Sequence, residues 1–129
     1  MRARVVTAAV AATLAGCAAD PMQCVCTTEF RTVLVQVTDA AGQPVAGATT
    51  RTVRTRDSLE ITPKFRDGQP GSYPLIDDSN HDAIDGPTVI TFTASTATGT
   101  ATLVGTASLD GCGCHIQYDG GSAVTLKNL

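Results

Sequence analysis

Residues Phe30 to Thr49 read F-R-T-V-L-V-Q-V-T-D-A-A-G-Q-P-V-A-G-A-T. In Phe30–Val37, valines alternate with polar or mixed residues, which predicts a β-strand with one apolar face. The D-A-A-G-Q that follows predicts a turn that reverses the chain, because Gly42 can adopt the positive φ that such turns need. Pro44 is expected outside the strand ladder, and Gly47-Ala48 is expected to open the next strand.

The same pattern continues to the C-terminus. Further strands are predicted at Ala48–Arg54, Ser58–Thr62, Tyr73–Ile76, Pro87–Ala94, Thr100–Leu109, Gly113–Tyr118 and Ala123–Lys127. Thr, Val and Ile dominate these segments, and turn signals recur about every ten residues. No segment shows a sustained helical period. The sequence therefore predicts an all-β chain, an antiparallel or mixed β-sandwich of about seven to eight strands.

Two segments resemble one known family. Val35–Thr49, V-Q-V-T-D-A-A-G-Q-P-V-A-G-A-T, resembles the opening hairpin of carboxypeptidase-regulatory-like domains, which are Ig-like or transthyretin-like (prealbumin-like) β-sandwiches. Gly71-Ser72-Tyr73 is similar to the later G-x-Y of the same group. The resemblance implies a non-catalytic accessory, adhesive or scaffolding module. The region Asp77–Leu129 is longer than the family pattern and its cysteines are not a general feature, which leaves strand count and topology open.

The N-terminus has the features of an export signal. Arg2 and Arg4 precede an apolar run, Val5–Leu14, that is shorter than the roughly 20 residues a spanning helix needs. Small residues follow this run, as they do at a signal cleavage site. The pattern predicts an exported chain from which residues 1–16 are removed.

The residues around the cleavage point are more specific. Leu14-Ala15-Gly16-Cys17 resembles the lipobox of bacterial lipoproteins. The resemblance implies cleavage before Cys17 and lipidation of its thiol. Ala18 follows in place of an aspartate, a pattern similar to that of family members sent to the outer membrane. The expected location is the cell envelope, lipid-anchored at the outer membrane. An ordinary secretory signal cleaved near Ala18 or Ala19, with Cys17 lost, is the alternative.

The expected domain organisation follows from this cleavage. Residues 1–16 are the signal peptide, 17–23 the lipidated N-terminus and short tether, and 24–129 the β-sandwich domain. Removing two arginines leaves 7 basic against 12 acidic residues, a net charge of −5. An acidic surface argues against nucleic-acid binding. The expected partners are the lipid bilayer, through acylated Cys17, and an envelope protein or polymer. No cofactor is expected.

Four cysteines follow the tether in two C-x-C pairs, Cys24, Cys26, Cys112 and Cys114. An even count in a small exported domain predicts a disulfide framework. Residues i and i+2 of a strand face the same side, so two C-x-C pairs on neighbouring strands can form two parallel rungs. Either Cys24–Cys112 with Cys26–Cys114, or Cys24–Cys114 with Cys26–Cys112, satisfies this geometry. Strand direction decides between the two pairings.

A metal site is the alternative for these cysteines, with His115 as a further ligand. Tetrahedral zinc favours ligand pairs with wider spacing than C-x-C, whereas copper(I) accepts closely spaced thiolates. Exported thiols are usually oxidised, which favours disulfides. Redox motifs are more often C-x-x-C, which makes a redox centre the least favoured interpretation. His115 is then expected to be a strand residue beside the staple.

The acidic loop Asp77–Asp85 is the other candidate site. Asp78, Asn80 and Asp82 mimic the first, third and fifth positions of an EF-hand calcium loop, but Ala83 replaces the required glycine. The favoured interpretation is a solvated loop whose side chains cap its own turns. Calcium binding by Asp78, Asn80 and Asp82 in a loop that is not an EF-hand is the alternative. A hydrolase that uses this loop with His81 would need the loop to line a concave pocket.

Three functional hypotheses result. The leading one is a lipid-anchored, disulfide-stapled module of the cell envelope with a non-catalytic binding or structural role. The second is a periplasmic metal-binding protein that uses the two C-x-C pairs. The third is a small hydrolase that uses the Asp77–Asp85 loop.

Overall fold

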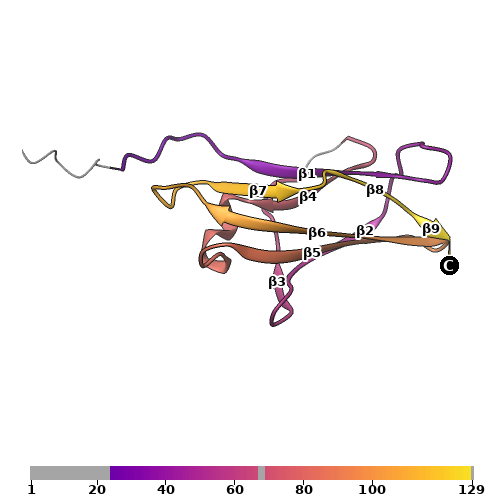
Figure 1. Ribbon diagram of the computed structural model, residues 1–129. Coiled ribbons are helices and arrows are strands. Elements are labelled where there is room, and N and C mark those ends of the chain that lie inside the picture. The colour runs from indigo at the N-terminus through magenta and orange to yellow at the C-terminus, as the bar shows by residue number, and fades with distance from the viewer. Residues whose placement is uncertain (1–23, 67–68, 129) are drawn as a thin grey trace, which may run out of the picture.

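The chain folds into two packed β-sheets (Figure 1). The structure, a computed structural model, describes residues 24–66 and 69–128. The expected signal peptide 1–16, the lipidated Cys17 and the tether 17–23 lie outside the described residues. In chain order the elements are β1 Thr32–Thr38, β2 Thr49–Arg54, β3 Leu59–Ile61, β4 Ser72–Asp77, the 3₁₀ helix η1 Asp78–Ala83, β5 Thr88–Ser95, β6 Gly99–Leu109, β7 Ile116–Gly120, β8 Ala123–Thr125 and β9 Lys127–Asn128.

The two sheets differ in size. A three-stranded sheet has the order β4-β1-β8, and a six-stranded sheet has the order β3-β2-β5-β6-β7, with β9 also paired to β6. Neighbouring strands are antiparallel except for β1 and β8, which are parallel. The predicted all-β, mixed sandwich is confirmed. Most strands lie within two residues of their predicted bounds, but those predicted at Gly113–Tyr118 and Ala123–Lys127 differ, and η1 was expected only as a loop.

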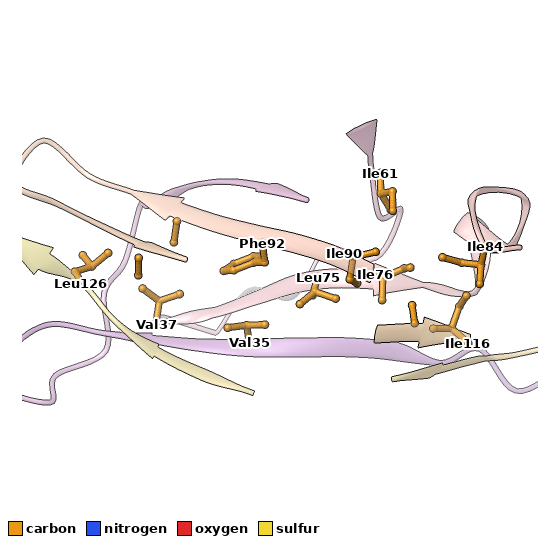
Figure 2. Packing of buried hydrophobic residues seen from close by; sticks show 13 residues of the cluster. Val35, Val37, Ile61, Leu75, Ile76, Ile84, Ile90, Phe92, Ile116 and Leu126 are labelled. Atoms are coloured by element: carbon orange, nitrogen blue, oxygen red, sulfur yellow. The ribbon is translucent and has the colours of Figure 1, made fainter. Parts of the chain in front are cut away.

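Alternation along the strands builds the core between the sheets. In β5 the buried residues Thr88, Ile90, Phe92 and Ala94 alternate with more exposed ones. Figure 2 shows Phe92 in the layer between the sheets, with buried side chains of the opposite sheet facing it. Each fully buried aliphatic or aromatic side chain contributes roughly 1.5–3 kcal/mol relative to an exposed one. The buried apolar residues are Val35, Val37, Ile61, Leu75, Ile76, Ile84, Ile90, Phe92, Ala94, Ala101, Ala107, Ile116 and Leu126.

The turn after β1 forms as predicted, but it does not lead into a hairpin partner. Gly42 has a φ of 78°, and Thr38 bridges Pro44 across the turn. The Asp39 carboxylate accepts hydrogen bonds from backbone N–H groups inside the turn. The chain then leaves for the other sheet, where β2 pairs with β3 and β5. The expected opening hairpin is therefore a crossover between sheets.

Tyr73 holds this crossover in place. Its hydroxyl donates to the Val45 carbonyl at 2.6 Å and accepts from the Ala48 N–H at 2.9 Å. Gly71 lies so close to Pro44 that a Cβ on Gly71 would stand 2.7 Å from the proline Cβ. The two segments that carry the family resemblance, 35–49 and 71–73, thus pack directly against each other.

The C-terminal segment also departs from its prediction. The single strand expected at Ala123–Lys127 is divided between two sheets, since β8 pairs with β1 and β9 pairs with β6. Leu126 lies between the two strands, is 8% exposed, and donates its N–H to the Thr38 carbonyl. Burial of Leu126 at the crossing point accounts for the change of sheet.

Candidate functional site

One end of the sandwich brings together the start of the described chain and the β6–β7 loop (Figure 1). We call this end the cysteine pole and define it by Cys24, Cys26, Thr27, Asp78, Cys112, Cys114 and His115. Two disulfides join its parts. Cys24 bonds to Cys112 with a Cα–Cα distance of 5.2 Å, and Cys26 bonds to Cys114 with a distance of 5.4 Å. This is the first of the two pairings that the sequence left open.

The cysteines do not lie on strands, which corrects the expected rung geometry. Cys24 and Cys26 precede β1 in irregular backbone, and Cys112 and Cys114 lie in the β6–β7 loop. The strand predicted at Gly113–Tyr118 begins only at Ile116. Gly113 has a φ of 69°, which turns the chain before β7 starts.

Asp110 organises the loop that presents Cys112 and Cys114. Its N–H donates to the His115 carbonyl at 2.9 Å, which closes the loop, and its carbonyl accepts from the Gly113 N–H at 2.8 Å. Its carboxylate accepts from the Cys114 N–H at 2.8 Å. This hydrogen bond is the main cause that lowers the pKa of Asp110. A short acidic turn therefore fixes both sulfurs toward the N-terminal segment.

A buried histidine lies directly beside the disulfides. His115 is 6% exposed, and its Nδ1 lies 2.7 Å from Oδ2 of Asp78. Its Nε2 lies 2.9 Å from the Thr27 hydroxyl. An ionised carboxylate only accepts, so Nδ1 carries a proton, and in the neutral imidazole Nε2 accepts from the Thr27 O–H. The expectation of a strand residue is wrong for His115, which precedes β7 and faces into the pole.

Asp78 anchors this arrangement from η1. Its carboxylate accepts from the Ile116 and Arg31 N–H groups, each at 2.8 Å, in addition to His115. Burial is the largest effect on its pKa and raises it, but the hydrogen bonds from His115, Ile116 and Arg31 together lower the pKa below its usual value. The carboxylate is therefore ionised at neutral pH, and it connects η1 to the residues that precede β1 and begin β7.

The rest of the Asp77–Asp85 loop is built as a helix start. Asp77 caps η1 by accepting from the Ser79 N–H, and Asn80 Oδ1 accepts from the Asp77 N–H in return. Two such reciprocal bonds form a capping box. The prediction of side chains that cap their own turns is confirmed for Asp77 and Asn80, but the prediction of a solvated loop is wrong at Asp77, which is 0% exposed.

The three residues that mimic an EF-hand have different partners. Asp78 faces His115, Asn80 bonds to Asp77 and to the Thr62 carbonyl, and exposed Asp82 lies 3.0 Å from the His81 ring. Within residues 24–66 and 69–128, no group of three or more His, Cys, Asp or Glu side chains is arranged to hold a metal ion. The sulfurs of both C-x-C pairs are engaged in disulfides.

His81 does not join the acidic loop in a hydrolase-like constellation. Its side chain is half exposed and bonds only to near neighbours in sequence. Four hollows on the described surface have no lining residue from Asp77–Asp85. The histidine that meets the loop is instead His115, 37 residues from Asp78 in sequence.

The link between Thr27, Asp78 and His115 was not predicted from the sequence. Each residue stands beside a feature that was recognised: Thr27 follows Cys26, His115 follows Cys114, and Asp78 opens the acidic loop. The disulfide pairing supplies the missing signal, because bonding Cys26 to Cys114 brings the residue after each cysteine to the same place.

The pole can act in two ways chemically. Exposed Thr27 and the buried side chains of His115 and Asp78 are connected in the order nucleophile, base and orienting carboxylate. The same hydrogen bonds also fasten the N-terminal segment to the sandwich next to two covalent links.

Comparisons with protein-family models, with curated proteins and with solved structures give no match for this chain. Among the residues that the structure describes, no helix is long and apolar enough to cross a bilayer.

Proposed function

We propose that this protein is a lipid-anchored module of the cell envelope, with a non-catalytic binding or structural role. The observation that carries the proposal is the cysteine pole. Two disulfides and the Asp78–His115–Thr27 hydrogen bonds fasten the chain immediately after the expected tether 17–23 to the body of the sandwich. Disulfides of this kind persist in oxidising compartments outside the cytoplasm.

The disulfides and hydrogen bonds of the cysteine pole suit a domain that is held by its N-terminus. A segment of irregular backbone before β1 would otherwise have few contacts that keep it from detaching from the sandwich under tension. Here a pull on residue 17 would be transmitted through Cys24 and Cys26 to the β6–β7 hairpin, and through Arg31 to Asp78. The tether and the sandwich would therefore keep a fixed attachment point, with the cysteine pole toward the bilayer and the opposite end of the domain away from it.

The resemblance to carboxypeptidase-regulatory-like domains supports the module role. Val35–Thr49 and Gly71-Ser72-Tyr73 carry that resemblance in sequence, and in the structure Tyr73 bonds to Val45 and Ala48. A non-catalytic sandwich of this kind displays a surface to an envelope protein or polymer.

Replacement of the lipidated residue tests the anchor. Cells that produce the wild-type chain or Cys17→Ser are given an alkyne-labelled fatty acid, and membranes are separated from soluble fractions. The wild type should incorporate the label and stay with membranes, and Cys17→Ser should lose the label. Ala19→Ser, which leaves Leu14–Cys17 intact, is the matched control. Equal processing and equal solubility of wild type and Cys17→Ser would instead support the ordinary secretory signal.

The order of residues at the pole favours a second candidate function, ester hydrolysis. His115 would take the Thr27 hydroxyl proton while the Thr27 oxygen bonds to an acyl carbonyl. His115 would then return that proton to the departing alcohol, and water would release the acid from Thr27. The backbone N–H groups of Thr27 and Thr28 have no hydrogen-bond partner in the described part of the chain. This version of the hydrolase hypothesis replaces His81 with His115.

A small ester separates the two functions. Hydrolysis of 4-nitrophenyl acetate should fall to the uncatalysed rate in Thr27→Val and survive in Thr27→Ser if Thr27 is a nucleophile. His81→Ala controls for general catalysis by an exposed imidazole. Equal rates for wild type and Thr27→Val would leave the hydrogen bonds with a structural role only.

A further inference from the structure

A groove opens on the side of the sandwich, at the end opposite the cysteine pole. It lies between β6 and β8, has a volume of about 440 Å³, and is lined on one wall by Ala101, Thr102 and Leu103 and on the other by Ala123 and Val124. This volume falls within the usual range for ligand pockets, roughly 300–1,000 Å³. No part of the cysteine pole contributes to it.

The groove exists because the C-terminal segment leaves β6 and returns to it. β7 pairs with β6 from Gly105 onward, and β9 pairs with Gly99 and Thr100. Between these two ladders the chain bows away and pairs with β1 as β8. The stretch of β6 from Ala101 to Val104 therefore has ladder partners on β5 and, among the described residues, none on its other side.

Both walls of the groove are consequently strand edges. β8 pairs with β1 on one side only, and its other side faces the groove. A free edge offers backbone N–H and C=O groups to an extended chain, which is the basis of recognition by strand addition. In an antiparallel ladder alternate residues direct these groups outward, so a stretch of four residues offers partners to a peptide of similar length.

The ends of the groove define which part of a peptide fits. The β9 ladder closes one end at Thr100 and the β7 ladder closes the other at Gly105. The open stretch spans roughly 13 Å, at about 3.3 Å per residue. A chain that continued in both directions along β6 would collide with β7 or β9. A chain end at Thr100 avoids the collision with β9, and the rest of the peptide leaves the edge of β6 before Gly105.

The positive charge of Lys127 at one end of the groove favours a C-terminus over an N-terminus. Lys127 lines the groove at the β9 end and is the only Lys or Arg after Arg66. Within residues 24–66 and 69–128 it has no ion-pair partner. The other lining residues are small or apolar, namely Ala101, Leu103, Ala123 and Val124 together with Thr100, Thr102 and Thr125. A lysine beside such a lining matches a chain terminus that carries a carboxylate and small side chains.

We propose that the β6–β8 groove binds the free C-terminus of an extended partner peptide, with its carboxylate at Lys127 and its backbone along Ala101–Val104. This gives the binding role of the proposed module a ligand class. The groove does not involve Cys17 or the disulfides, so a failure of this proposal and a failure of the lipid anchor are observed separately.

Fluorescence anisotropy with a labelled peptide tests the proposal on the full chain as cells produce it. The probe is fluorescein-Gly-Gly-Thr-Val-Thr-Val with a free carboxylate, and the matched probe has the same sequence with a C-terminal amide. The amidated probe lacks a charge-assisted contact, so it should bind roughly tenfold or more weakly than the probe with a free carboxylate. Lys127→Gln should remove this difference, and Lys64→Gln, which changes another exposed lysine, should preserve it.

A blocking variant tests the location. Ala123 is exposed on β8 and lines the groove, so Ala123→Trp should fill the space without disturbing the core. This variant should bind the peptide with the free carboxylate at least tenfold more weakly than the wild type does. A peptide with alternate N-methylated amides should bind the wild type equally weakly, because it cannot pair with β6. Equal binding of acid and amide, unchanged binding by Ala123→Trp, or no binding at millimolar peptide would each overturn the proposal.

Discussion

The two disulfides close nearly the same loop, and this redundancy makes a quantitative prediction. Each bond joins residues that are 88 positions apart. In the chain-entropy model, a single link that closes a loop of this length stabilises the fold by about 4–5 kcal/mol. Once either link is present, the other closes only a small ring through the two C-x-C segments, which is worth about 2 kcal/mol in the same model.

Removal of one disulfide should therefore lower the free energy of unfolding far less than removal of both. Cys24→Ser/Cys112→Ser should lose about 2 kcal/mol of unfolding free energy, and so should Cys26→Ser/Cys114→Ser. The quadruple variant should lose about 6–7 kcal/mol, more than the sum of the two pairs. Small domains have a total stability of about 5–15 kcal/mol, so the quadruple variant should be marginally folded at 25 °C.

Urea unfolding under non-reducing conditions measures these differences. The slope of free energy against urea should also rise in the quadruple variant, because its unfolded chain is less compact. The matched comparison is wild type under reducing conditions, which should approach the quadruple variant. Two pair variants whose losses add up to that of the quadruple variant would refute the shared-loop reasoning, as would a single pair that costs more than about 4 kcal/mol.

Three further changes test other parts of the structure. Asp78 has a lowered pKa, so the stability it contributes is present above the usual aspartate value of 3.8 and is lost as pH falls through the folded pKa. Asp78→Asn should lower the free energy of unfolding by about 2–3 kcal/mol at pH 7. Its urea midpoint should change less between pH 5 and 2 than that of the wild type. Parallel curves of urea midpoint against pH for the two proteins would contradict this. Ser58 has a φ of 57° in the β2–β3 turn, so Ser58→Gly should raise the free energy of unfolding by about 1 kcal/mol, and a loss of stability would show that the turn is not strained. The buried Ser72 hydroxyl has no hydrogen-bond partner among the described residues, so Ser72→Ala should stabilise by about 1 kcal/mol in thermal unfolding, whereas destabilisation would indicate a bond that the structure does not contain.

Local patterns were sufficient to predict most strands. The alternation in Phe30–Val37 and in Pro87–Ala94 reflects one buried face, and the structure buries Val35, Val37, Ile90 and Phe92 accordingly. The turn at Gly42 was visible because its conformation is determined by residues in the turn itself.

Contacts between distant segments were not available from such patterns. The crossover after β1 depends on Tyr73, which lies 25 residues from Ala48. The split of Ala123–Lys127 depends on burial of Leu126 between sheets. The link from Thr27 to His115 spans 88 residues, and it follows only once the disulfide pairing is known.

We propose an oxidised sandwich that is held to the membrane through Cys17. The most direct measurement is the intact mass of the membrane-extracted protein, before and after alkylation without reductant. We expect the mass of the chain from Cys17 plus acyl groups, with no alkyl group added. A mass without acyl groups that begins at Ala18 or Ala19 would contradict the anchor, and four added alkyl groups would contradict the two disulfides.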